Sequence, residues 1–169
     1  GKRSIGLAAD GLPPKWFTKN PEAPFSADLD EMLAVIRNAV RVASESGQAD
    51  SVFDLWQGVY HEQKMWAEAT AYPPLLWAFG VSLVERAAID AFCRGTGRTF
   101  ATAVRNGSLG IRLDAIHPEL SGKSPADCLT ATPLSDIRVR HTVGLADPLT
   151  GADISEDEKL TDGLPQSLE

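Results

Sequence analysis

Residues 75–100 read LLWAFGVSLVERAAIDAFCRGTGRTF and form the stretch that decides the fold. Apolar side chains recur along it at steps of three and four residues, which predicts a helix. Small residues on its other faces would let neighbouring elements approach closely. The recurring positions are Leu76, Phe79, Leu83, Ala87 and Ala91.

Proline and glycine mark the ends of this helix. The Pro73–Pro74 pair fits its start, and Gly95 stands where a left-handed C-cap would end it. A membrane span is disfavoured, because Glu85, Arg86 and Asp90 would all have to lie within the hydrocarbon. We therefore predict a central, nearly buried helix.

The bulk composition sets the class of protein. The chain has 169 residues, of which 43% are apolar and 23% charged, as in a soluble globular protein. Its net charge of −7 argues against binding nucleic acid or anionic membranes. No apolar leader is seen, and Cys93 and Cys128 are too few for a disulfide framework. We expect a reducing, cytoplasmic setting.

Other stretches predict further helices and two strands. Helices are expected from Asp28 to Gly47, where Asp28 and Glu31 form a capping box, and from Ser51 to about Ala69. Shorter helices are expected at 99–105 and 125–129. Residues 4–9 and the alternating residues 137–145 predict strands. A lone strand is not stable, so we expect the chain to be a fragment whose strand partners lie elsewhere.

Three stretches resemble one family in the order that the family requires. They are SIGLAADGLPPKWFTKNP (4–21), VERAAIDAFCRGTGRTF (84–100) and RVRHTVGLADPLTGADI (138–154). The second is similar to a small-residue helix of the N-terminal capping domain of the enolase superfamily, in its mandelate racemase and muconate lactonizing enzyme branch. The first resembles the exit loop of that domain, and the third resembles the first strand of the following barrel.

The resemblance implies an α+β fold class. Residues 1–134 would be a partial, mainly helical capping domain with a short strand at its start. Residues 135–169 would be the first strand and loop of an incomplete TIM-type (β/α) barrel. The parent would be an Mg²⁺-dependent isomerase or lyase that removes the proton alpha to a carboxylate, as a racemase, cycloisomerase or acid-sugar dehydratase. Its base and metal ligands come from later strands, so no catalytic residue or metal ligand is assigned here and the fragment should be inactive.

Substrate contacts are expected from the exit loop and from the end of the barrel strand. Lys15 and Trp16 lie in the loop, and Asp147 follows the strand. In the alternative, Trp16 and Phe17 pin the loop to the helices while Lys15 is solvated, and Asp147 caps a turn. His141 in the strand is either a polar group of the barrel interior or a satisfied core histidine.

A rival function stays open: a free-standing helical interaction module, without catalysis, that docks a partner on an apolar helix face. For the enzyme, the expected partners are a small carboxylate substrate and the missing barrel domain. A homo-oligomer is left open. The acidic run at 153–162 is interpreted as a solvated face, since it lacks the glycine and terminal glutamate of a calcium loop. The substrate and the choice among the three reactions are not determined by the sequence.

Overall fold

The computed structural model describes residues 3–20, 22–130, 132–140, 144 and 147–169. The chain divides into two units, Gly1–Ala131 and Thr132–Glu169. This division reflects contacts alone, and the assignment of residues 1–134 and 135–169 to a cap and a barrel stays a prediction.

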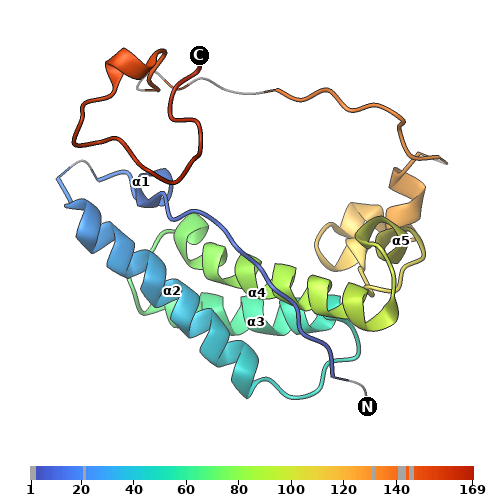
Figure 1. The fold of residues 1–169 in the computed structure, drawn as a ribbon. Coiled ribbons are helices and arrows are strands. Elements are labelled where there is room, and N and C mark those ends of the chain that lie inside the picture. The colour runs from blue at the N-terminus through green and yellow to red at the C-terminus, as the bar shows by residue number, and fades with distance from the viewer. Residues whose placement is uncertain (1–2, 21, 131, 141–143, 145–146) are drawn as a thin grey trace. The chain divides into compact units, whose positions relative to one another are not determined.

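Three long helices build the first unit (Figure 1). They are α2 (Phe25–Glu45), α3 (Val52–Glu68) and α4 (Pro74–Thr96), and each packs against the other two. Burial of one large apolar side chain contributes about 1.5–3 kcal/mol, so their shared interior is the main source of stability. Its fully buried apolar side chains include Met32, Val35, Val59, Leu76 and Val81.

Local signals explain where these helices begin and end. The Ser51 side chain accepts a hydrogen bond from the Asp54 amide at 3.0 Å, which caps α3 as predicted. The central helix is confirmed, but it is not nearly buried: only five of its 23 residues are buried, Leu76, Trp77, Phe79, Gly80 and Val81. It ends at Thr96, and its left-handed cap is Gly97, with φ of 66°, instead of Gly95. No described helix is long and apolar enough to cross a membrane.

A polar pair lies inside the bundle and joins all three helices. Gln63 of α3 is fully buried, and its Oε1 accepts from Asn38 Nδ2 of α2 at 2.7 Å. Its Nε2 donates to the carbonyls of Val35 at 2.9 Å and Trp77 at 3.2 Å. Because each helix supplies a partner, the pair is satisfied only when all three are in register.

Shorter elements complete the first unit. The helix α1 (Pro14–Phe17) precedes α2, and α5 (Phe100–Arg105) follows α4 and confirms the helix expected at 99–105. Three single turns of 3₁₀ helix follow: η1 (Leu113–Ala115), η2 (Pro118–Leu120) and η3 (Pro125–Cys128). The last of these is the short helix expected at 125–129, in tighter form.

The predicted α+β class is wrong, because the described residues form helices and no strand. Residues 4–9 are extended but have no strand beside them, so no ladder of hydrogen bonds can form. The alternating pattern at 137–145 also fails as a strand over its described residues. Ile137 is 81% and Val139 88% exposed, so no apolar face is buried there. His141 lies outside the described residues.

The second unit holds one described turn of 3₁₀ helix, η4 (Gly151–Asp153). Asp153 Oδ2 accepts from the Thr150 amide at 2.8 Å and from its hydroxyl at 3.1 Å. Both hydrogen bonds lower the pKa of Asp153, and the one from the Thr150 amide has the larger effect. One member of the acidic run therefore stabilises a turn.

Candidate docking surface

The N-terminal segment, residues 3–12, runs in extended form along the outside of α4 (Figure 1). Gly6 approaches the helix so closely that a Cβ at this position would lie 1.9 Å from the carbonyl oxygen of Ala87 and 2.3 Å from the amide nitrogen of Ala91. Only a residue without a side chain fits there. The small residues of α4 that the sequence singled out thus accept an extended chain.

Two charged residues of α4 hold this segment in place. The Leu7 amide donates to Asp90 Oδ2 at 2.9 Å. Arg86 pairs with Asp10 at 2.8 Å and donates to the Ala9 carbonyl at 3.3 Å. The hydrogen bond from Leu7 is the main reason why the pKa of Asp90 lies below its ordinary value. These ionisable residues therefore anchor backbone groups on the helix surface.

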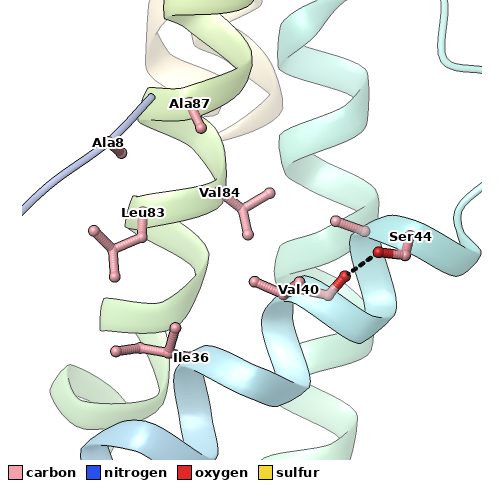
Figure 2. Close-up of a pocket in the computed structure, with 8 residues that line it drawn as sticks. Ala8, Ile36, Val40, Ser44, Leu83, Val84 and Ala87 are labelled. Carbon is pink, nitrogen blue, oxygen red and sulfur yellow. Dashed lines mark hydrogen bonds between the residues drawn. The ribbon is translucent and has the colours of Figure 1, made fainter. Parts of the chain in front are cut away.

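An apolar groove opens between this segment, α2 and α4 (Figure 2). It encloses about 430 Å³, within the range of about 300–1,000 Å³ typical of ligand pockets. Seven of its eight lining residues are apolar, and the Oγ of the eighth, Ser44, already donates to the Val40 carbonyl at 2.7 Å. The lining residues are Ala8, Ile36, Val40, Ala43, Ser44, Leu83, Val84 and Ala87.

The segment that borders the groove carries other exposed apolar side chains. Val40 is 51% exposed on its wall, and Ile5 and Leu7 of the N-terminal segment are 79% and 71% exposed. Isolated apolar residues on a surface are ordinary, but neighbouring ones beside a hollow are typical of interaction sites. Sequence reasoning missed this groove, because Ile36 and Val40 follow the same helical stripe as the buried Met32.

Lys15, a predicted substrate contact, is engaged in an ion pair. Its Nζ lies 2.6 Å from Oδ2 of the buried Asp28, off the direction of a hydrogen bond. The same ammonium donates to the carbonyls of Ala23 at 2.7 Å and Asn20 at 3.1 Å. Contact with Lys15 is the main cause that lowers the pKa of Asp28. Asp28 thus anchors the loop instead of capping α2, which begins at Phe25.

The other two predicted contacts, Trp16 and Asp147, have contacts of their own. Trp16 is 70% exposed, with Lys19 Nζ 5.6 Å from its ring, whereas Phe17 packs on Phe79 with ring centroids 4.9 Å apart. In the second unit, Asp147 Oδ2 accepts from the Gly144 amide at 2.6 Å and closes a turn. Neither Lys15 nor Trp16 lines the groove of the first unit. The contact of Lys15, Trp16 and Asp147 with a substrate stays a prediction.

The described residues do not fit the Mg²⁺ ion that the resemblance implies for the parent. Among them, no three His, Cys, Asp or Glu side chains are gathered where they could hold a metal. The groove and the extended segment beside it present apolar side chains and backbone groups.

The comparisons with known proteins leave the family undetermined. The chain matches no protein-family model, no curated protein and no solved structure.

Proposed function

We propose that the helical unit is a docking domain, without catalytic residues of its own, that binds a segment of another polypeptide in the groove between α2 and α4. The observation that carries this proposal is the groove itself. Its walls are apolar, and its single hydroxyl is already hydrogen-bonded within α2. Such a site offers no nucleophile or acid–base pair, but it gains free energy when apolar side chains fill it.

The test uses peptides selected from a random phage-displayed library on the immobilised 169-residue chain. Val40→Lys places a charge on the exposed groove wall and should lower the affinity of the selected peptides by about tenfold, the equivalent of one lost valine contact. Leu75→Lys is the matched control, since Leu75 is 60% exposed on α4 and does not line the groove. Peptides that bind both variants equally well, or a selection that enriches none, would refute docking in this groove.

A second candidate rests on the loop that carries α1. The pair of Lys15 with Asp28 and the packing of Phe17 on Phe79 fix this loop, and the Trp16 ring is nevertheless left in solvent. An exposed indole on an anchored loop suits a lid that covers a carboxylate substrate in an Mg²⁺-dependent enzyme, as the resemblance implies. The base and metal ligands would then come from other polypeptide sequence.

The coding sequence beyond Glu169 tests this second candidate. A Lys-x-Lys segment followed by spaced acidic residues would support it, and a stop codon would contradict it. The 169-residue chain with Mg²⁺ should not exchange the alpha proton of a carboxylic acid with solvent. Exchange by the chain alone would show that the chemistry does not lie elsewhere.

A further inference from the structure

The backbone of the N-terminal segment has two edges. In an extended chain, the amide and carbonyl groups of alternate residues point to the same side. The Leu7 amide and the Ala9 carbonyl, two residues apart, are bound by Asp90 and Arg86 of α4. Gly6 and Ala8 therefore direct their backbone groups to the opposite side.

That opposite edge is free. Within the described part of the chain, the amide and carbonyl groups of Gly6 and Ala8 have no hydrogen-bond partner. Ala8 also lines the groove, as Figure 2 shows, so the free edge borders the apolar hollow. An occupant of the groove would cover these backbone groups and remove them from water.

This geometry decides what kind of occupant the groove accepts. A helix uses its backbone donors and acceptors internally, so a bound helix would leave the groups of Gly6 and Ala8 buried and unpaired. Each group buried in this way loses its hydrogen bonds to water and gains none in return, which weakens binding. An extended polypeptide has its own free amides and carbonyls at the spacing of Gly6 and Ala8, and it pairs with them instead.

Resting on the docking function proposed above, we propose that the partner is an extended segment of another polypeptide that pairs its backbone with Gly6 and Ala8. Apolar residues at alternate positions of that segment would enter the groove, because side chains of an extended chain alternate between its two faces. The outward Ile5 and Leu7, 79% and 71% exposed, would flank the bound segment.

Hydrogen exchange measured by NMR on the ¹⁵N-labelled chain tests this mode of binding. With the tightest peptide of the library at about ten times its Kd, exchange of the Gly6 and Ala8 amides should slow by about tenfold. The Leu7 amide, already bound to Asp90, is the internal control and should change little. A peptide N-methylated at one pairing position should bind about tenfold more weakly, and one methylated at the next residue should bind normally.

The possible failures are distinguishable. If Val40→Lys weakens binding but Gly6 and Ala8 exchange as in the free chain, docking in the groove stands and the extended mode is wrong. If Val40→Lys has no effect, the docking function itself fails. If Gly6 and Ala8 are protected without peptide and the chain sediments as a dimer, the occupant is a second copy, which overturns the partner proposed here.

Discussion

Gly80 allows a close approach of α2 to α4, so Gly80→Ala perturbs the packing of this bundle directly. A Cβ added at Gly80 would lie 2.3 Å from the carbonyl oxygen of Val35, 2.8 Å from its carbonyl carbon and 3.1 Å from Ala39 Cβ. Non-bonded carbon atoms pack best at about 3.5–4.0 Å. The obstacle is helix backbone, which cannot rotate away, so the two helices must separate.

Two opposing effects set the size of the change in stability. Alanine is favoured over glycine in a helix interior by about 0.8–1.0 kcal/mol. Forcing an extra methyl group into a packed interface typically costs about 1–3 kcal/mol. A shift of Val35 also weakens the bond that its carbonyl accepts from Gln63, worth about 1 kcal/mol. The steric costs outweigh the gain, and we expect a net loss of about 1–3 kcal/mol in the free energy of unfolding.

Gly58 provides the matched control, because it lies inside α3 and a Cβ there would meet nothing within 4 Å. Gly58→Ala should therefore stabilise the protein by up to about 1 kcal/mol. Urea unfolding followed by far-ultraviolet circular dichroism measures both variants. The reasoning is refuted if Gly80→Ala is as stable as Gly58→Ala, since helix propensity alone would then govern both sites.

Two further predictions concern buried polar groups and pH. Gln63→Leu removes the buried amide, leaves Asn38 Nδ2 and the carbonyls of Val35 and Trp77 without this partner, and should cost about 2–4 kcal/mol in the free energy of unfolding. Gln57→Leu, on the same helix, removes only an exposed hydrogen bond from Arg112 and should cost less, about 0.5–1.5 kcal/mol. Equal losses in urea unfolding would show that the buried amide is unimportant. Contact with Lys15 lowers the pKa of Asp28, whereas burial raises the pKa of Glu85. The two shifts have opposite effects on stability at neutral pH. Asp28 stabilises the folded chain above its ordinary value of 3.8, and this contribution is lost as pH falls toward its folded pKa. Asp28→Asn should therefore lower the urea midpoint at pH 7 and matter less in acid. Ionised Glu85 opposes folding above its raised pKa, so Glu85→Gln should raise the urea midpoint at pH 7. If the two variants shifted the urea midpoint in the same direction, these roles of Asp28 and Glu85 would be wrong.

The helices could be predicted from the sequence because their signals are local. Periodicity located the central helix, and Ser51 with Asp54 marked the start of α3. The stop signal was less certain, because Gly95 and Gly97 are equally able to adopt a left-handed conformation and only packing distinguishes them. Gly95 stays helical and packs against Ser4: a Cβ added at Gly95 would lie 3.1 Å from Ser4 Cβ.

The strands could not be predicted correctly from the sequence. Alternation of apolar and polar residues is a property of one segment, whereas a ladder of backbone hydrogen bonds needs a second strand beside it. Residues 4–9 do adopt the extended backbone that their pattern indicates, but their edge contacts are side chains of Asp90 and Arg86 instead of another strand. The ion pair of Lys15 with Asp28 was missed for a related reason. It joins residues across a loop, and local reasoning assigned Asp28 to a helix cap.

The groove lies between elements that two glycine contacts bring close to α4. Gly80 draws α2 against α4 at Val35, and Gly6 seats the N-terminal segment against α4 at Ala87. Val40 and Leu83 line the hollow between these elements (Figure 2). A bundle that needed only stability would fill this space, since dispersion contacts are lost around any void. Ala8 lines the hollow and also belongs to the free backbone edge of the N-terminal segment. Both the hollow and this edge suit the extended partner proposed above.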